Sequence, residues 1–332
     1  MEGLVMGTFT GKNVLVTGAT GLVGGAYTEK LLSEGANVFA LIADIPANCE
    51  LKRSGNLEKV TQIYGDLSNR EVVARAITAY EIEAIFHFGA QTIVGTALLD
   101  PIGTFQSNIQ GTWNILEASR NSKGLVRCIV VASSDKAYGE SSVLPYLEDF
   151  PLHGKSPYDV SKSCTDLLAQ SYARTYNMPI GIARCGNIYG PGDLNWSRIV
   201  PSTIKSITLG QQPVLRSDGK NLRDYVYIKD VVSAYHTLGS SIFNGDIESG
   251  EFNFSVDSPK SVLEIYYAVC NAVGVKVEPL ILNSAQAEIK DQFLSSRKAN
   301  QILNWSEKYD LELGLNETVP WYHRVIREGR GL

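Results

Sequence analysis

Short runs of hydrophobic residues, many of them β-branched, alternate through the first half of the chain with longer segments of helical periodicity. The short runs predict strands at residues 13–17, 37–42, 60–64, 84–88, 126–132 and 179–184. The segments between them predict helices near residues 22–34, 69–80, 104–122 and 158–177. Strands that alternate with helices in this way build βαβ units. We therefore expect an α/β fold with a doubly wound parallel sheet.

The pattern changes after about residue 186. The segment GNIYGPGD is rich in turn-forming residues, and the later hydrophobic runs are short and separated by irregular stretches. This predicts a larger domain over residues 1–185 and a smaller C-terminal α/β lobe over residues 186–332, with the chain free to cross back between them. Residues 311–326 again have helical spacing, which predicts a helix near the end of the sequence.

The composition is that of a folded protein. Of the 332 residues, 44% are hydrophobic and 20% are charged, so the chain can bury a core. The net charge is -5, and no long basic run occurs, so general binding to nucleic acid or to an anionic membrane is not expected. No hydrophobic run approaches the ~18 residues of a membrane span, and the first residues lack the apolar core of a signal peptide. We expect a cytoplasmic location.

The spacing of cysteine and histidine argues against disulfides and metal sites. The cysteines are odd in number, form no CxxC pair and therefore read as free thiols in a reducing compartment. They are Cys49, Cys128, Cys164, Cys185 and Cys270. The four histidines show neither HExxH nor any other metal-ligand spacing, so no metal is expected.

A glycine-rich turn directly follows the first predicted strand. Gly18, Gly21 and Gly24 stand in the pattern GxxGxxG within TGATGLVG. Gly18 permits a tight turn, Gly21 lets backbone amides approach a pyrophosphate, and Gly24 allows close packing of the helix whose N-terminus favours negative charge. We expect this turn to bind a dinucleotide, the alternative being a purely structural turn. The other residues of the turn that are assigned to the cofactor are Thr20, Leu22 and Val23.

Two aspartates follow the second and third predicted strands. Asp44 comes two residues after the second strand, where a carboxylate accepts hydrogen bonds from ribose hydroxyls and repels a 2′-phosphate. This favours NAD over NADP, although a solvated loop aspartate is the alternative. Asp66, in the segment YGDL, is placed to reach the adenine of the same cofactor.

A tyrosine and a lysine stand four residues apart at the start of the helix predicted near residues 158–177. Tyr158 and Lys162 share a face because of this spacing. The lysine ammonium favours the phenolate, which lowers the pKa of the tyrosine toward the range of a general base. The pair gains weight because it follows the glycine turn and a strand that ends in SSDKAYG.

At these residues the chain resembles the extended short-chain dehydrogenase/reductase family, the nucleotide-sugar epimerases and dehydratases. The matching segments are TGATGLVG, GDL, FHFGAQ, SNIQGT, SSDKAYG, YDVSK, RCGNIYGPG, RDYVYIKD and LNWSEKYDLELGLNETVPWY. The resemblance implies a Rossmann-type sheet with a smaller substrate-binding lobe, NAD as cofactor and a nucleotide-diphosphate sugar as substrate. It also implies a homodimer built on the helices near residues 104–122 and 158–177.

The resemblance assigns roles to individual residues. Ser134, Tyr158 and Lys162 form the catalytic triad: Tyr158 takes the proton of a sugar hydroxyl, Ser134 hydrogen-bonds the same oxygen, and Lys162 also binds the nicotinamide ribose. Asn108 supports the site, and Arg223 holds the substrate pyrophosphate. The further cofactor contacts are Leu67, Phe88, Gly89 and Ala90. The further substrate contacts are Gln91, Asn187, Arg198 and Arg216, of which the two arginines read equally well as surface residues.

The pair that follows the triad serine, Asp135-Lys136, is similar to that of the CDP-glucose type of 4,6-dehydratase. A dehydratase oxidises C4 of the sugar, removes the acidified proton from C5 and expels water from C6, after which hydride returns to C6. Asp135 suits the proton donor if burial raises its pKa. Lys136 can act as a neutral base or stabilise the enolate, and these alternatives stay open.

The resemblance therefore implies an NAD-dependent nucleotide-sugar 4,6-dehydratase, CDP-glucose-like. The segment GNLRDYVYIKD has instead the general form of the family. The nearest alternative is a 4-epimerase acting on a UDP-sugar, which shares the triad, and a non-catalytic NAD-binding regulator is a further one. The base of the nucleotide depends on residues between about 195 and 260, where spacing gives no answer.

Overall fold

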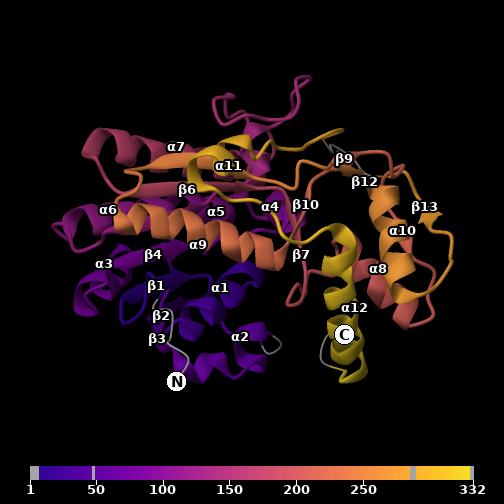
Figure 1. Cartoon of the computed structure of the whole chain (residues 1–332), viewed down its shortest axis with the longest axis horizontal. Coiled ribbons are helices and arrows are strands. Elements are labelled where there is room, and N and C mark those ends of the chain that lie inside the picture. The colour runs from indigo at the N-terminus through magenta and orange to yellow at the C-terminus, as the bar shows by residue number, and fades with distance from the viewer. Residues whose placement is uncertain (1–6, 47–48, 285–288, 330–332) are drawn as a thin grey trace. The chain divides into compact units, whose positions relative to one another are not determined.

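The computed structural model describes residues 7–46, 49–284 and 289–329. Its main sheet has seven strands in the order β11-β6-β5-β4-β1-β2-β3 (Figure 1). The strands are β1 (Asn13–Thr17), β2 (Asn37–Ile42), β3 (Thr61–Tyr64), β4 (Ala84–His87), β5 (Cys128–Ala132), β6 (Ile180–Cys185) and β11 (Gly250–Phe254). The pairings β1–β2, β1–β4, β2–β3, β4–β5 and β5–β6 are all parallel, which confirms the predicted α/β fold.

Helices follow the strands as the hydrophobic periodicity predicts. In chain order they are α1 (Leu22–Ser33), α2 (Glu50–Arg53), α3 (Arg70–Ala79), α4 (Val94–Leu99), α5 (Pro101–Phe105), α6 (Gly111–Asn121), α7 (Pro157–Tyr176), α8 (Ile199–Thr208), α9 (Ile228–Asn244), α10 (Val262–Val273), α11 (Arg297–Leu303) and α12 (Leu311–Arg327), with 3-10 turns η1 (Asn56–Lys59) and η3 (Asp135–Tyr138). One expectation needs correction. The helix predicted near residues 104–122 starts at Pro101 and contains a π-helical turn, η2 (Gln106–Gln110), between α5 and α6.

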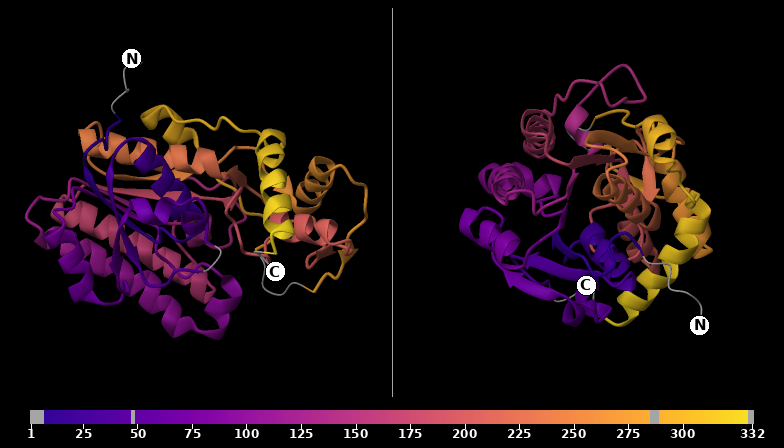
Figure 2. Two further views of the ribbon diagram at one scale, coloured as in Figure 1. Left: turned by 90° about the horizontal axis from the view of Figure 1, so that it is seen from below. Right: turned by 60° about the vertical axis from the view of Figure 1, so that its left-hand side comes forward.

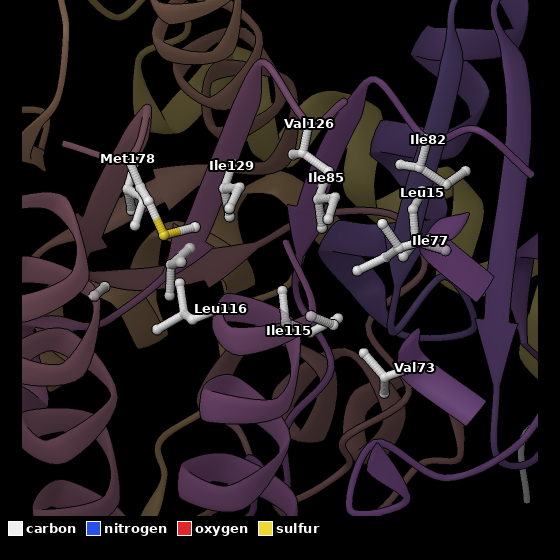
Figure 3. Packing of buried hydrophobic residues seen from close by; sticks show 14 of the residues in the cluster. Leu15, Val73, Ile77, Ile82, Ile85, Ile115, Leu116, Val126, Ile129 and Met178 are labelled. Atoms are coloured by element: carbon white, nitrogen blue, oxygen red, sulfur yellow. The ribbon is translucent and has the colours of Figure 1, made fainter. Parts of the chain in front are cut away.

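The two faces of the sheet are covered by different helices. On one face, strand residues such as Leu15 and Ile129 pack with Ile77 of α3 and Leu116 of α6 in one hydrophobic core (Figure 3). On the other face, α9 lies so close to β6 that a Cβ on Gly181 would stand 2.7 Å from Ile242 Cδ1. Both faces are therefore buried, as a doubly wound sheet requires.

The described chain divides into two compact units. The first consists of the described residues up to Gly139 together with Glu148–Arg184 and Val232–Phe252, and it contains the predicted triad residues Ser134, Tyr158 and Lys162. The second consists of Glu140–Leu147, Cys185–Val231 and the described residues from Asn253 onward. The boundary expected between residues 185 and 186 lies one residue from the point where the chain passes from the first unit to the second, after Arg184. Two segments depart from the expected division. Residues 140–147 belong to the second unit although they precede the boundary, and residues 232–252 belong to the first unit although they follow it.

The second unit has short strands and three packed helices. Its strands form the pairs β7 (Asn187–Tyr189) with β10 (Tyr225–Tyr227), β9 (Leu222–Arg223) with β12 (Lys260–Ser261), and β8 (Val214–Leu215) with β13 (Leu280–Ile281). Helices α8, α10 and α12 pack on one another, and α12 (yellow) lies beside α10 in Figure 1 and in the left view of Figure 2. In the described part of the chain, no helix has both the length and the apolar character needed to cross a bilayer.

Candidate active site

The glycine turn after β1 is held by backbone contacts. Gly18 has φ +70, in the region that favours glycine, and a Cβ there would lie 2.7 Å from Gly89 N. A Cβ on Gly24 would lie 2.2 Å from Gly18 O, and Gly21 N donates to Gly18 O at 2.9 Å. Because these neighbours are main-chain atoms, they cannot move aside as a flexible side chain could. The turn has room only for glycine at Gly18 and Gly24.

The N-terminus of α1 fits a phosphate group. Gly21 is the N-cap, and among the described residues no side chain caps this helix start and no acidic residue lies in its first turn. The N–H groups of the first turn therefore point to an anion site where the helix dipole favours negative charge. Thr20, Leu22 and Val23 belong to the same turn. The residues present fit the pyrophosphate of NAD.

The parallel register brings the predicted cofactor residues to one edge of the sheet. Thr17, at the end of β1, is in register with Leu41 of β2, so exposed Asp44 follows β2 at the edge where the glycine turn follows β1. Asp66 follows β3 at that edge, and its Oδ1 accepts a hydrogen bond from Ser68 N at 2.7 Å. Both carboxylates are exposed. Their positions agree with contacts to the adenosine half of NAD.

The segment after β4 contributes main chain. Gly89 N donates to Thr17 Oγ1 at 3.0 Å, and the side chain of Leu67 lies against Gly89. The ring of Phe88 packs on Tyr235, with 4.8 Å between the ring centroids. Phe88 therefore offers its backbone to the edge of the sheet, while its ring belongs to the hydrophobic packing.

His87, at the end of β4, connects the glycine turn to helix α6. Its Nδ1 lies 2.8 Å from Thr17 Oγ1 and its Nε2 lies 3.1 Å from Thr112 Oγ1, which donates to Asn108 O at 2.6 Å. Because the Thr112 hydroxyl proton is used by Asn108, Nε2 is the protonated nitrogen and Nδ1 accepts from Thr17. Burial and the charge of Lys162 lower the pKa of His87 to about 3, which keeps the ring neutral. Sequence spacing gave no sign of this role.

Asn108, in the π-helical turn, holds two segments together. Its Oδ1 accepts from Gln91 N at 2.7 Å, and its Nδ2 donates to Gln91 O at 3.0 Å and to Ser161 Oγ at 2.8 Å. Ser161 Oγ in turn donates to Tyr158 O at 2.7 Å. A single buried amide thus ties the segment of Gln91 to the first turn of α7. This geometry agrees with the supporting role expected for Asn108.

Helix α7 presents the predicted tyrosine and lysine. It begins with Ser156 as N-cap and Pro157 at its first position, and Ser156 and Asp159 form a capping box. Tyr158 and Lys162 are both buried. Lys162 Nζ donates to Ala132 O, at the end of β5, at 2.8 Å. Helix α7 therefore sets the Lys162 ammonium beside the strand that leads to Ser134.

The turn after β5 joins Ser134, Asp135 and Lys136 in one network. Ser134 Oγ donates to Asp135 Oδ1 at 2.9 Å, and Lys136 Nζ lies 3.4 Å from Asp135 Oδ2. The side chain of Asp135 is only 3% exposed and that of Lys136 is 22% exposed. Both oxygens of Asp135 therefore serve as hydrogen-bond acceptors at this turn. The proton-donor role expected for Asp135 stays a prediction.

A buried ion pair lies behind this turn. Arg184 of β6 donates to both carboxylate oxygens of Asp166 on α7, at 2.8 and 2.9 Å, and to Tyr138 Oη of η3 at 2.6 Å. Ser133 Oγ donates to Asp166 Oδ2 at 2.6 Å. Burial acts to lower the pKa of Arg184, but its pairing with Asp166 raises the pKa above the ordinary value. The signal that could have revealed Arg184 is a charged residue inside the apolar run IGIARC.

The substrate residues predicted in the second unit have different surroundings. Arg223 is buried and directs its guanidinium to the main-chain carbonyls of Leu222, Ile289 and Lys290. Arg198 pairs with Asp193 at 3.1 Å. Asn187 is partly buried and Arg216 is exposed. In this structure Arg223 therefore binds the backbone of its own unit.

A Rossmann-type sheet with a glycine turn after its first strand defines a dinucleotide-binding class of α/β protein. Residues 14–253 match the sequence family described as the NAD dependent epimerase/dehydratase family. The chain belongs to this family, which confirms the resemblance seen in the sequence. NAD is the cofactor of the family, as predicted.

Relatives with known activities cover nearly all of the chain. The trifunctional UDP-glucose 4,6-dehydratase/UDP-4-keto-6-deoxy-D-glucose 3,5-epimerase/UDP-4-keto-L-rhamnose-reductase of Arabidopsis thaliana is 27% identical over 96% of this chain, which spans 48% of that enzyme. The CDP-glucose 4,6-dehydratase of Salmonella typhimurium is 28% identical over 96% of this chain and 92% of its own. The UDP-glucose 4-epimerase of Thermotoga maritima, solved with UDP-glucose, has a TM-score of 0.85 at 26% identity and covers 95% of this chain and 99% of its own.

These similarities establish the family of nucleotide-sugar epimerases and dehydratases. By name, the relatives carry out both reactions. The chain spans about half the length of the plant enzymes that it matches.

Proposed function

We propose that this chain is a nucleotide-sugar 4,6-dehydratase that uses bound NAD and acts on a CDP-glucose-like substrate. The observation that carries the proposal is the Asp135-Lys136 pair, in which buried Asp135 accepts a hydrogen bond from the hydroxyl of Ser134 and contacts the partly exposed ammonium of Lys136. An epimerase needs to remove and restore hydrogen only at C4. A dehydratase also needs charged groups that serve C5 and C6, and a carboxylate and an ammonium next to the triad serine supply them.

The triad would carry out the first step. NAD, when bound, accepts hydride from C4 of the sugar and returns it to C6. Tyr158 takes the proton of the C4 hydroxyl, and Ser134 hydrogen-bonds the same oxygen. The ammonium of Lys162 favours the phenolate of Tyr158 and contacts the nicotinamide ribose. The hydrogen bond from Lys162 Nζ to Ala132 O at 2.8 Å orients that ammonium.

The second unit would hold the nucleotide diphosphate. Arg223 is the proposed partner of the pyrophosphate, with Asn187 near the sugar and Arg198 and Arg216 as further contacts. Gln91, a residue of the first unit, is a further proposed substrate contact. The donors of Arg223 now serve main-chain carbonyls of residues 222, 289 and 290. A pyrophosphate offers stronger, charge-assisted acceptors to the same donors. Binding would then exchange carbonyl oxygens for phosphate oxygens.

One experiment distinguishes the reactions. The protein is incubated in deuterated water with CDP-, dTDP-, GDP- and UDP-hexoses, and the products are analysed by mass spectrometry. A dehydratase yields a product that has lost one water and gained deuterium at C5. An unlabelled product of unchanged mass would contradict the proposal and identify a 4-epimerase. Bound NAD without turnover of any hexose would instead point to a non-catalytic regulator.

A homodimer built on α6 and α7 is the proposed assembly. Trp113 on α6 and Leu167 and Tyr176 on α7 are large, exposed hydrophobic residues. Exposed apolar faces of this kind mark contact surfaces between proteins. Sedimentation that shows a monomer at micromolar concentration would rule out this dimer. Cell fractionation would test the expected cytoplasmic location.

A further inference from the structure

Helix α7 is attached to the segment that carries Ser134 at points on either side of that serine. Before Ser134, the ammonium of Lys162 donates to Ala132 O, at the end of β5, at 2.8 Å. After it, the hydroxyl of Ser163 donates to Ala137 O, in η3, at 2.7 Å. Because both bonds end on main-chain carbonyls, they fix the path of the backbone between Ala132 and Ala137.

Asp166 adds a third attachment, at the residue directly before Ser134. Its Oδ2 accepts from Ser133 Oγ at 2.6 Å, and Ser133 N donates to Ala183 O of β6 at 2.9 Å. Asp166 follows Lys162 by one helical turn, so both act from the same face of α7. The residue before Ser134 is therefore held to the helix by its side chain and to β6 by its main chain.

Arg184 fixes the direction in which Asp166 acts. Its Nε and Nη2 donate to the two carboxylate oxygens at 2.8 and 2.9 Å, the bidentate arrangement of an arginine with a carboxylate. Its Nη1 donates to Tyr138 Oη, at the end of η3, at 2.6 Å and to Glu148 O at 2.9 Å. One guanidinium therefore connects α7, through Asp166, to the far end of the turn that follows Ser134.

Burial makes this ion pair a poor source of stability by comparison with apolar packing. The side chains of Arg184 and Asp166 are 1% and 0% exposed, so both charges have lost their hydration. Well-packed hydrophobic residues in place of a buried ion pair often leave stability unchanged or increase it. Hydrophobic side chains cannot replace the directional hydrogen bonds to Ser133 and Tyr138. The network is therefore better suited to setting positions than to adding stability.

We propose that the buried Asp166–Arg184 pair is a positioning pair, which sets where Ser134 stands relative to the catalytic residues of α7. This inference rests on the roles that the proposed function gives to Ser134, Tyr158 and Lys162. It holds for the dehydratase and for the 4-epimerase, because both begin with oxidation at C4. In that step the C4 hydroxyl proton passes to Tyr158 while the hydrogen on C4 leaves as hydride to NAD. The hydroxyl of Ser134 and the phenolate must therefore reach one oxygen together.

A double variant separates position from stability. Asp166→Leu/Arg184→Met replaces the pair by apolar side chains and leaves no uncompensated charge. The wild type and the variant, each loaded with NAD, are compared by urea unfolding and by turnover of whichever CDP-, dTDP-, GDP- or UDP-hexose the wild type converts. We expect a urea midpoint close to that of the wild type, but a kcat about a hundredfold lower with KM changed less than about threefold. Recovery of turnover together with stability would overturn the inference.

Single hydrogen bonds give a milder test that leaves the charges in place. Ser133→Ala removes the donor nearest to Ser134, and Ser133→Thr keeps a hydroxyl at the same position. The matched control is Gln170→Ala, which removes the hydrogen bond from Gln170 Nε2 to Asp166 Oδ1, 2.7 Å long and internal to α7. We expect Ser133→Ala to lower kcat about tenfold, Ser133→Thr to stay within about threefold of the wild type, and the control to leave kcat unchanged. Equal kcat values for Ser133→Ala and Gln170→Ala would show that the bond to the strand positions nothing.

A measurement without substrate distinguishes a failure of this inference from a failure of the proposed function. Hydrogen exchange of the NAD-loaded protein, followed by mass spectrometry, reports on residues 134–139, where Ala137 N donates to Ser134 O at 3.1 Å. We expect exchange in this segment to be at least about tenfold faster in Ser133→Ala and in the double variant than in the wild type or Gln170→Ala. If the wild type converts none of the four hexoses, the proposed function fails and exchange alone decides. Unchanged exchange in both variants would then refute the positioning role.

Discussion

Replacing Asp166 by leucine removes the counter-ion of Arg184 from the core of the first unit. The side chains of Arg184 and Asp166 are 1% and 0% exposed, and Asp166 accepts hydrogen bonds from Arg184, Ser133 and Gln170. The substitution leaves a buried guanidinium without its counter-ion, hydrogen-bonded only to the neutral acceptors Tyr138 Oη and Glu148 O. Breaking a buried pair from one side costs about 3–5 kcal/mol, because the remaining charge is neither solvated nor paired.

Urea unfolding of the whole chain, monitored by fluorescence and circular dichroism, measures this cost. We expect Asp166→Leu to lower the free energy of unfolding by about 3–5 kcal/mol, and Arg184→Met to lower it by a similar amount. The double variant should recover most of the loss, since no uncompensated charge remains. The matched control is the partly exposed pair of Lys12 and Glu83, with side chains 35% and 25% exposed, where Lys12→Met should cost at most about 1 kcal/mol.

The refuting result is a small loss of stability. If Asp166→Leu costs no more than Lys12→Met, the buried network does not stabilise the unit. If the double variant is as unstable as the sum of the two single variants, the two charges are not coupled and the packing around them accounts for the effect.

Three further predictions concern the same unit. Asp135→Asn should still oxidise C4, seen as reduced-nicotinamide absorbance, but should not release water; dehydration at the normal rate would show that Asp135 is dispensable. Gly24→Ala should lower NAD affinity at least about tenfold in a fluorescence titration, because its Cβ would lie 2.2 Å from Gly18 O, and unchanged affinity would show that the turn adapts. His87, whose pKa falls from 6.5 to about 3 on folding, binds a proton in the unfolded chain before it does so in the folded one. The stability that neutral His87 contributes to the folded chain is therefore fully present above about pH 6.5 and is lost as the pH falls toward 3. Between pH 7 and pH 5, the free energy of unfolding in urea should fall by about 2 kcal/mol more for the wild type than for His87→Gln. Equal losses in the two proteins would contradict this.

The local features were readable from the sequence. The glycine turn, the β-branched runs and the Tyr158–Lys162 spacing each depend on residues close together along the chain, so a period or a turn chemistry reveals them. The ends of the strands also place Asp44 and Asp66 at one edge, since parallel strands share their direction. The interruption of the helix near residues 104–122 was not readable, because a π-helical turn needs the buried contacts of Asn108.

By itself, the sequence determined the class of fold, the cofactor turn and the segment that carries the Asp135-Lys136 pair. The tertiary structure alone decided which buried polar side chains meet. Arg184 of β6 finds Asp166 of α7 across 18 residues of chain. His87 finds Thr17 across 70. Polar side chains buried among apolar strands and helices leave no periodic signal, and their protonation depends on partners that only folding brings within hydrogen-bond distance.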